Sequence, residues 1–560
     1  MNEELKRKVR FNTLAIVLII VFSFCISPKT LQNDTFYTIS IGEYIMENGL
    51  SDKAEPFAWH EGLEYTFPHW AYDVMIYLIY SVGGHLGIYI STIVLCAILG
   101  IIMYVTSSKL MKNRVVSFII TIASLYLLKD YVAARAQLAT FILFVATIYC
   151  IESFLDTGKK RYGVGLIIIP IIIANFHVAV FPFYFILYLP YIVEYMIHIL
   201  SHTSIIINQA KIDSIHKKIL KSKNENEIQN LKNKLSELEL KNDKLHKRKD
   251  KIRKNAYKIT IKPREHINTL IIIMMIAVFA GFVTPLGLTP YTYLIQTMQG
   301  TTTHNISEHL PLTLIDNINF MVVLILFIAL LTFTDTKIRL CDLFMLAGLT
   351  FLTFYTRRQE SMFILICSYI LIRLICDFLN KYDPDGNVKL EKRITKILGI
   401  IIITALILIM GIPQYGKKYE DEYVSTNSYP VQASEWILKN LDIENIKLYN
   451  EYNYGSYLLF KGIPVFIDSR ADLYSPEFNE NATIFTDFLK MSALTTSIEY
   501  VEEMIDKYDI THFIMYKNGS KSNLAKYIEQ APEKYELIYP LGDLEDENFY
   551  IFERSKDRVK

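Results

Sequence analysis

Eleven apolar stretches, each about as long as a bilayer is thick, dominate the pattern of hydrophobic and polar positions in the chain. The hydrocarbon core is about 30 Å thick and a helix rises about 1.5 Å per residue, so roughly 20 apolar residues cross it once. The pattern therefore predicts a polytopic α-helical membrane protein with about eleven spans. The predicted spans cover residues 11–28, 87–108, 115–131, 135–155, 162–177, 179–200, 267–285, 317–335, 340–356, 359–380 and 395–413.

The loops between these spans differ in charge. Alternate loops carry clusters of Lys and Arg, and the loops between them carry almost none. Short cytoplasmic loops hold an excess of these residues, so we expect a cytoplasmic N-terminus and a last span that ends outside. The basic N-terminus with residues 11–27 resembles a signal peptide, but no small-residue cleavage motif follows, and we interpret it as an uncleaved span. The clusters predicted to lie inside are Lys6, Arg7, Lys8 and Arg10; Lys109, Lys112 and Arg114; Lys159, Lys160 and Arg161; Lys337 and Arg339; and Lys381, Lys389, Lys392, Arg393 and Lys396.

Two segments depart from the spanning pattern. Residues 1–415 form the predicted transmembrane module, whereas residues 416–560 alternate short apolar segments with amphipathic ones, which predicts an extracytoplasmic α/β domain. Its predicted strands and helices include IKLYN, YGSYLLFKG, IPVFIDSR, HFIMYK, SNLAKYIEQ, YELIYP and NFYIFER.

An insertion at residues 203–264 is dense in Lys, Glu and Asn. Apolar residues recur there at alternating spacings of three and four, which predicts a cytoplasmic coiled-coil hairpin with its turn at 223–226. The hairpin is either a solvated structure without chemistry or a docking arm for a cytoplasmic protein partner. Its predicted seam contains Ile212, Ile215 and Ile219 on one helix and Ile228, Leu231, Leu235, Leu238, Leu245 and Ile252 on the other, with Asn242 and Lys249 as interruptions.

Composition narrows the function classes. Hydrophobic residues make up 52% of the chain, and the net charge of +1 gives no reason to expect a nucleic-acid partner. All six cysteines lie in or beside apolar runs without CxxC spacing, so we expect free thiols. The sequence contains neither GxxxxGK[ST] nor GxGxxG, which argues against a cytoplasmic nucleotide-sugar donor.

The first outer loop, residues 29–86, is too polar to cross a bilayer. Apolar residues between Tyr37 and Ile45 recur at helical spacing and predict a helix in the membrane plane. Asp34, just before it, lies near the interface, where a carboxylate is costly unless a water-filled site uses it. The alternative is that Asp34 caps the following helix. We interpret this loop as the floor of an active site.

The unusual polar residues all map to the outer side of the predicted topology. Each has a structural explanation: an Arg at a span end extends to head groups, His and Asn side chains join helices, and Asp468 and Arg470 form an ion pair that ends a strand. Their joint occurrence favours a binding site for a phosphate-bearing, partly lipidic substrate. The candidates are Asp34 as the catalytic residue and, for substrate binding, His60, His69, Asp73, Arg135, Gln137, Asn175, His177, Glu308, His309, Arg357, Arg358, Asp468 and Arg470.

Short motifs in this order resemble the GT-C superfamily of integral-membrane glycosyltransferases, in a poorly characterised bacterial branch. They are GEYIxENGL, PFAWH and HWxYD in the first outer loop, then RxQ, NFH, PLG, EHLP and RRQE, and finally FIDSRADLY. The resemblance covers nearly the whole chain apart from the insertion.

The resemblance implies a sugar donor carried on polyprenyl phosphate and transfer at the outer membrane face. By position, Asp34 matches the first-loop catalytic carboxylate, which acts as general base on the acceptor hydroxyl. Arg135, His177, Arg357 and Arg358 match candidates for the donor phosphate. Asn33 precedes Asp34 and no second acidic residue adjoins it, unlike many members. No metal is assigned, and a divalent cation such as Mg²⁺ or Mn²⁺ is the candidate cofactor.

We therefore expect a multi-pass cell-membrane glycosyltransferase whose acceptor is a cell-envelope glycan, lipid or protein. Two alternatives belong to other classes. A transporter or flippase of lipid-linked saccharides also needs a polar cavity beside membrane lipids, but it is expected to show internal repeats with broken helices at mid-depth, which the sequence lacks. A non-catalytic envelope scaffold would use the coiled coil and the outer domain to recruit other proteins.

Overall fold

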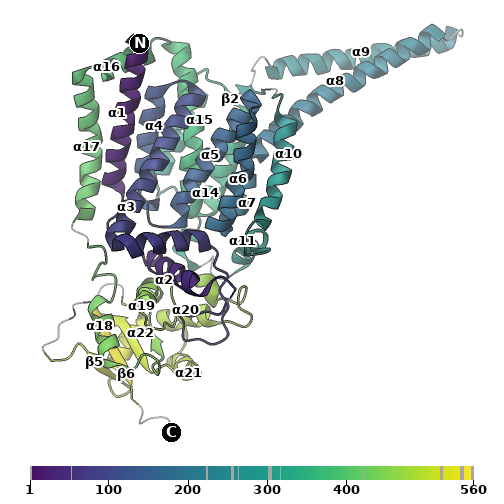
Figure 1. Ribbon diagram of the computed structural model, residues 1–560. Coiled ribbons are helices and arrows are strands. Elements are labelled where there is room, and N and C mark those ends of the chain that lie inside the picture. The colour runs from purple at the N-terminus through teal and green to yellow at the C-terminus, as the bar shows by residue number, and fades with distance from the viewer. Residues whose placement is uncertain are drawn as a thin grey trace.

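A helical bundle and an α/β domain stacked on one end of it make up the protein (Figure 1). The computed structural model describes residues 3–51, 53–221, 225–253, 258–262, 264–300, 305–315, 317–419, 422–517, 521–542, 546 and 548–555. The N-terminus lies at the end of the bundle that is remote from the α/β domain.

Each predicted span overlaps at least one helix of the bundle, and the span predicted at 179–200 falls on two, α7 and the start of α8. By length and composition, six described helical segments are able to cross a membrane: Glu3–Ile26, Trp70–Met111, Ala136–Thr157, Val178–Leu220, Arg357–Tyr382 and Ile397–Lys417. The bundle helices are α1 (Glu3–Ile26), α3 (Trp70–Met111), α4 (Arg114–Leu127), α5 (Ala136–Thr157), α6 (Lys160–Phe176), α7 (Phe181–Ile186), α8 (Leu189–Lys221), α10 (Ile267–Val278), α13 (Ile318–Phe333), α14 (Leu340–Tyr355), α15 (Glu360–Tyr382) and α17 (Ile397–Tyr419).

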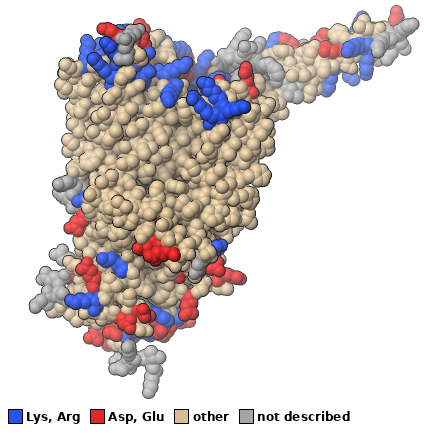
Figure 2. Space-filling view, in the orientation of Figure 1, with Lys and Arg blue, Asp and Glu red and all other residues tan. Residues whose placement is uncertain are grey.

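The surface of the bundle is suited to lipid. Figure 2 shows a broad band without charged side chains around its middle, and Lys and Arg side chains gathered at the end that carries the N-terminus. Aliphatic residues such as Val94, Val322 and Ile401 are about half exposed on this bundle. Exposed apolar surface of this extent marks contact with lipid, and the chain is a multi-pass membrane protein.

A buried ion-pair cluster joins the helices near the N-terminal end of the bundle. Arg339 lies 2.6 Å from both Glu152 and Asp342, and Arg373 lies 2.5 Å from Asp342. Arg264 lies 3.6 Å from Glu152. Buried charges are tolerated when they are paired, and this cluster, which no sequence pattern predicted, ties α5, α14 and α15 together. The same end carries β1 (Ile259–Thr260) paired parallel to β2 (Ile338–Arg339), α9 (Glu225–Arg253) and α16 (Gly386–Ile394).

The α/β domain contains a four-stranded sheet of order β3-β4-β6-β5. β3 and β4 are parallel, and β6 is antiparallel to both β4 and β5. Helices and strands of this domain are α18 (Val431–Asn440), β3 (Leu448–Tyr449), α19 (Tyr452–Phe460), the 3-10 helix η6 (Ala471–Tyr474), α20 (Ile484–Ala493), α21 (Ile498–Lys507), β4 (His512–Tyr516), α22 (Asn523–Gln530), β5 (Tyr535–Tyr539) and β6 (Phe549–Arg554).

One predicted strand of this domain is not a strand of the sheet. The segment IPVFIDSR, which leads to Asp468 and Arg470, makes a single parallel bridge, from Val465 to Ala58 in the first outer loop. The Val465 amide donates to the Phe57 carbonyl of the first outer loop over 3.1 Å, whereas the Phe466 amide donates to the Asn450 side chain of the α/β domain over 2.9 Å. The segment joins the two parts of the protein instead of extending the sheet.

The helix predicted between Tyr37 and Ile45 is confirmed as α2 (Asn33–Asn48). It lies between the bundle and the α/β domain, next to the first segment of α3, which ends at a kink at Gly84 (Figure 1). Phe36 packs edge-on against Tyr429 and Tyr457, with ring centroids 5.0 and 5.1 Å away. These contacts fix α2 to the α/β domain.

Gly42 sets the distance between α2 and α3. A Cβ atom at this position would lie 2.2 Å from the carbonyl oxygen of Asp73 and 2.6 Å from the Cβ of Tyr77. We expect Gly42→Ala to force the two helices apart and to destabilise the protein by roughly 1–3 kcal/mol, as overpacking does. Thermal unfolding in detergent measures the effect. Gly348→Ala is the control, because no atom lies within 4 Å of its added Cβ, and an equal loss in both variants would contradict the close approach.

Candidate active site

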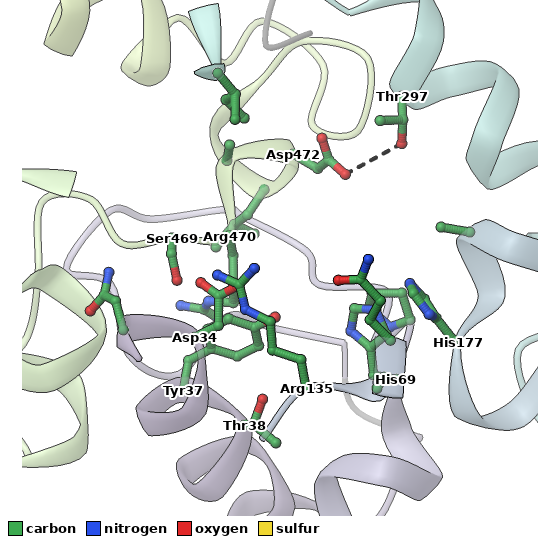
Figure 3. A pocket seen from close by; sticks show the side chains of 18 of the residues that line it. Asp34, Tyr37, Thr38, His69, Arg135, His177, Thr297, Ser469, Arg470 and Asp472 are labelled. Carbon is green, nitrogen blue, oxygen red and sulfur yellow. Dashed lines mark hydrogen bonds and ion pairs between the residues drawn. The ribbon is translucent and has the colours of Figure 1, made fainter. Parts of the chain in front are cut away.

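A cavity of about 380 Å³ lies where α2 and the starts of α3 and α5 meet α11 (Thr289–Gln299) and the segment at η6 (Figure 3). A second cavity of about 230 Å³ shares Arg135, Gln137, Glu308 and Arg358 with it. The two are parts of one cleft at the boundary between the bundle and the α/β domain.

The cleft brings together most of the residues selected from the sequence. Ten of the fourteen candidates line the main cavity, and Arg357 lines the second one. These ten come from six separate parts of the chain and are Asp34, His69, Asp73, Arg135, Gln137, His177, Glu308, His309, Arg358 and Arg470.

Asp34 forms an ion pair at the centre of the cavity. Its Oδ2 lies 2.7 Å from Nη2 of Arg135, the residue that precedes α5. Asp34 belongs to the first turn of α2, and Gln32 occupies the cap position, so the alternative of a helix cap does not describe it. The Asp34 carboxylate points toward the arginines in Figure 3 and keeps a quarter of its side chain exposed, which leaves it accessible to a substrate.

The three arginines of the main cavity differ in how their charge is balanced. Arg135 also contacts Glu308 at 3.4 Å, and Arg470 is bound by Glu55 and Asp468 at 2.6 Å each. For Arg358, no acidic side chain in the described parts of the chain lies within 4.0 Å. Its charge is thus available to an anion in the cleft.

Neutral imidazoles line the wall near Arg358. The rings of His69 and His177 lie 4.9 Å apart, and Nδ1 of His177 is 3.0 Å from the Thr140 hydroxyl. Desolvation and the nearby guanidinium groups of Arg358 and Arg135 lower the pKa of His69 to about 3. Desolvation and Arg358 lower the pKa of His309 to about 4. At neutral pH both rings are therefore hydrogen-bonding groups and not cations.

The α/β domain supplies the opposite wall through Asp472. Its Oδ2 accepts hydrogen bonds from the Tyr293 hydroxyl at 2.8 Å and from the Thr297 hydroxyl at 3.3 Å, both on α11 (Figure 3). Burial raises the pKa of Asp472 above its usual range. Tyr452 of the α/β domain also lines the cavity, as do Tyr37 of α2 and Tyr65 of the first outer loop, so aromatic rings and hydroxyl groups make up much of the lining.

Several of these lining residues were not among the predicted site residues. Tyr293 and Thr297 are four residues apart on one helix, a spacing that places them on the same face, and this signal was present in TPYTYLIQT. Tyr37 was identified only as an apolar position of α2. No sequence signal marks Ser469 or Asn453 as lining residues: Asn453 lies in the first turn of α19, and Ser469 lies in the segment that leads to η6.

Three predicted site residues lie away from the cavity. Nε2 of His60 is 2.8 Å from the Phe466 carbonyl oxygen, among aromatic rings. Asn175 accepts from the Trp70 indole at 3.1 Å and donates to the Val283 carbonyl at 2.9 Å. Both side chains hold elements together.

Asp468 is the third. It is fully buried, and Arg470 and the Tyr474 hydroxyl each donate to its Oδ2 over 2.6 Å. Arg470 bridges Asp468 to Glu55 of the first outer loop, so this ion pair fastens the α/β domain to that loop.

The acidic groups of the cleft do not form an evident metal site. In the searched, described residues, no group of three or more His, Cys, Asp or Glu side chains has the geometry to hold a metal ion. Among the described residues, the cleft offers the carboxylates of Asp34 and Glu308 beside Arg135, a guanidinium, that of Arg358, without an acidic partner within 4.0 Å, and neutral imidazoles. This combination is suited to removing a proton and stabilising a departing anion.

Comparison with known proteins gives matches of structure alone. Neither protein-family models nor curated protein sequences match this chain. The crystal structure of the Archaeoglobus fulgidus oligosaccharyltransferase tethered to an acceptor peptide with the NVT sequon aligns with 97% of this chain and 74% of that chain, at a TM-score of 0.52 and 11% identity. The oligosaccharyltransferase AglB of the same organism, in complex with an inhibitory peptide and a dolichol-phosphate, aligns with 90% of this chain and 69% of that chain, at a TM-score of 0.53 and 10% identity.

A structure of the Archaeoglobus fulgidus oligosaccharyltransferase in the apo form aligns with 90% of this chain and 69% of that chain, at a TM-score of 0.51 and 10% identity. These neighbours are of GT-C type, and the alignment covers the bundle and the α/β domain together. The chain therefore has the GT-C fold, as the sequence motifs predicted.

The low pKa of His69 predicts acid-sensitive stability. In the folded protein the ring stays neutral down to about pH 3, whereas in the unfolded chain it binds a proton below about pH 6.5. Stability is thus complete above pH 6.5 and is lost as the pH falls toward 3. Between pH 7.5 and 5 this term amounts to about 2 kcal/mol, and we expect His69→Gln to remove it. Melting temperatures at pH 7.5 and 5 test it: an unchanged pH difference in the variant would show that His69 does not contribute.

Proposed function

We propose that the protein is a membrane glycosyltransferase that transfers a sugar from a polyprenyl-phosphate-linked donor to a cell-envelope acceptor at the outer face of the membrane. The observation that carries the proposal is the Asp34–Arg135 pair in a cleft that also holds the uncompensated Arg358. The GT-C fold supports it, since fold neighbours act as oligosaccharyltransferases.

Arg358 is the group we assign to the donor phosphate. Transfer breaks the bond between the anomeric carbon and the phosphate oxygen, so negative charge grows on the leaving lipid phosphate. A nearby guanidinium stabilises that charge more in the transition state than in the bound donor, which accelerates the reaction. His309 and Gln137 line the same region and are able to donate hydrogen bonds to phosphate oxygens.

Asp34 is the general base of the proposed reaction. It takes the proton of the acceptor hydroxyl while the hydroxyl oxygen bonds to the anomeric carbon and polyprenyl phosphate departs. Arg135 holds the Asp34 carboxylate in place through their ion pair. Because the lipid phosphate is already a good leaving group, this reaction needs no general acid.

The neighbours also bear on the substrates. One was solved with a dolichol-phosphate and another with a tethered acceptor peptide, which supports a lipid phosphate as donor here. A glycan, a lipid and a protein all remain acceptors that the cleft is able to admit. The direct test is to incubate the purified protein with a panel of polyprenyl-phosphate sugars and an envelope extract, and to measure released polyprenyl phosphate and labelled product.

The same assay separates this function from transport. A flippase of lipid-linked saccharides moves its substrate between leaflets without cleaving it, so donor movement in proteoliposomes without released polyprenyl phosphate would contradict the transferase proposal. A non-catalytic scaffold would give neither movement nor release.

Asp34→Asn tests the general base. The amide keeps the shape of the side chain but cannot accept the proton, and loss of a general base lowers kcat by roughly 10²- to 10⁴-fold. Glu47→Gln is the matched control, because Glu47 lies on the same helix with an exposed side chain. The assay is initial-rate release of lipid phosphate by monodisperse protein. Turnover by Asp34→Asn near that of Glu47→Gln would remove Asp34 from the catalytic role.

Arg358→Gln tests the phosphate site. Loss of a charged hydrogen bond in the cleft is expected to lower kcat/KM for the donor by about 10- to 100-fold. Arg358→Lys, which retains the charge without the planar fork, is expected to lose less. Arg161→Gln at the far end of the bundle serves as control. Equal donor kinetics in Arg358→Gln and the control would assign the phosphate to another group.

A further inference from the structure

Helix α8 continues beyond the bundle and, with α9, forms a hairpin that projects from the end carrying the N-terminus (Figure 1). Inside the bundle, the Tyr191 hydroxyl donates to Glu152 over 2.7 Å, and Glu194 lies 3.6 Å from Arg264. These contacts anchor the first turns of α8. Of the two helices of the hairpin, α8 lies on the side nearer the apolar band of the bundle. The predicted turn at 223–226 lies largely outside the described residues.

One face of α8 is covered by α9. Ile205, Asn208, Ile212 and Ile215 recur at spacings of three and four and are at most 9% exposed. The Asn208 amide also donates to the Leu238 carbonyl over 2.8 Å. The packing side of α8 is thus fixed, and the opposite side faces away from α9.

The uncovered face of α8 is apolar near the bundle and basic farther out. Exposed apolar side chains continue along it past the predicted end of the span at residue 200, and exposed lysines follow them. Within the described chain, the lysines of this face, Lys211, Lys217 and Lys218, have no ion-pair partner. Asp213, at the edge of the face, accepts a hydrogen bond from Gln209 at 3.1 Å. The face comprises Met196, Ile199, Leu200, Ile206 and Ile207, which are 38–64% exposed, and the exposed Lys211, Lys217 and Lys218.

We propose that this face of α8 lies against the membrane surface and binds the anionic head groups of phospholipids. Ile206 and Ile207 would be costly in water but are suited to the interface between head groups and acyl chains, where apolar helix faces bind. The three lysines have the charge that complements anionic lipid and the length to reach it. The face is also continuous with the lipid-facing surface of the bundle, so the membrane it needs is already beside it.

Charge along the hairpin agrees with a lipid partner. Between residues 203 and 253 the sequence has 14 Lys and Arg against 7 Asp and Glu. In the described chain, Lys247 of α9 is paired with Asp243 at 2.6 Å, whereas the lysines of the α8 face, like Lys232, Lys241 and Lys244 of α9, have no acidic partner within 4.0 Å; only the α8 lysines follow an exposed apolar face. A soluble protein partner is the competing occupant, and it would leave this face in water when the partner is absent. The proposal does not depend on glycosyl transfer.

The test places one fluorescent label on each side of the hairpin in the full-length protein. Ser214→Cys lies among the lysines of the α8 face, and Ser236→Cys is an exposed position on α9. Five of the six native cysteines are buried, and unmutated protein gives the labelling background. In nanodiscs of phosphatidylglycerol, a quencher attached to the lipid is expected to quench the Ser214→Cys label several-fold more than the Ser236→Cys label.

Charge variants complete the test. Lys211→Gln, Lys217→Gln and Lys218→Gln together are expected to reduce the preference for docking by about fivefold per lysine, and quenching should fall to the Ser236→Cys level. Phosphatidylcholine nanodiscs or about 0.5 M NaCl should have the same effect, because salt screens this attraction. The matched control, Lys232→Gln, Lys241→Gln and Lys244→Gln on α9, should leave quenching unchanged.

Three results would overturn the proposal. One is equal quenching of the two labels in anionic nanodiscs, which a site for a soluble protein would give. Another is quenching at Ser214→Cys that does not depend on lipid charge. The third is an equal loss from the α8 and α9 triple variants, which would reflect total charge instead of this face.

Discussion

The close packing of α2 against α3 is the constraint on which the cleft depends. α2 crosses the end of a membrane bundle, where the hydrophobic effect alone does not fix the position of a half-polar helix. The absence of a side chain at Gly42 lets the backbones of α2 and α3 touch, and Phe36 locks the other side of α2 to the α/β domain. Asp34 is therefore held at a defined distance from Arg135, which belongs to another helix.

The charges of the protein follow one rule at both ends of the bundle. Where ionised groups are buried for structural reasons, they are paired: Glu152 with Arg339, and Arg470 with Glu55 and Asp468. In the described chain, Arg358 in the cleft and the exposed lysines on the uncovered face of α8 have no acidic partner within 4.0 Å. An unpaired charge is costly in a partly enclosed cleft, and on this ground we propose Arg358 as an anion site.

The cleft is built from both parts of the protein. The bundle side provides Arg135 and Arg358, whereas Asp472 and Ser469 come from the α/β domain. The Arg470 ion pairs and the bridge between Ala58 and Val465 tie this domain to the first outer loop. One continuous apolar core that includes Phe36, Tyr72 and Tyr449 supports both walls.

By itself, the sequence determined what local pattern and the membrane dictate. Each of the eleven predicted spans contains a helix, and α2 lies where the spacing of Tyr37, Ile41 and Ile45 predicted it. Short motifs predicted the GT-C fold. These predictions were possible because hydropathy, helical period and motif order are properties of residues that are close in sequence. Ten of the fourteen candidate site residues line one cavity, since mapping them to one side of a membrane already restricts where they meet.

Only the tertiary structure decided which polar side chains have hydrogen-bond or ion-pair partners within the protein. It assigned His60, Asn175 and Asp468 to structural contacts, turned IPVFIDSR into a connector instead of a strand and added Tyr293 and Thr297 to the cleft. Within the described residues, it left Arg358 without an acidic partner within 4.0 Å. Pairing depends on side chains that are distant in sequence, and no local pattern encodes it.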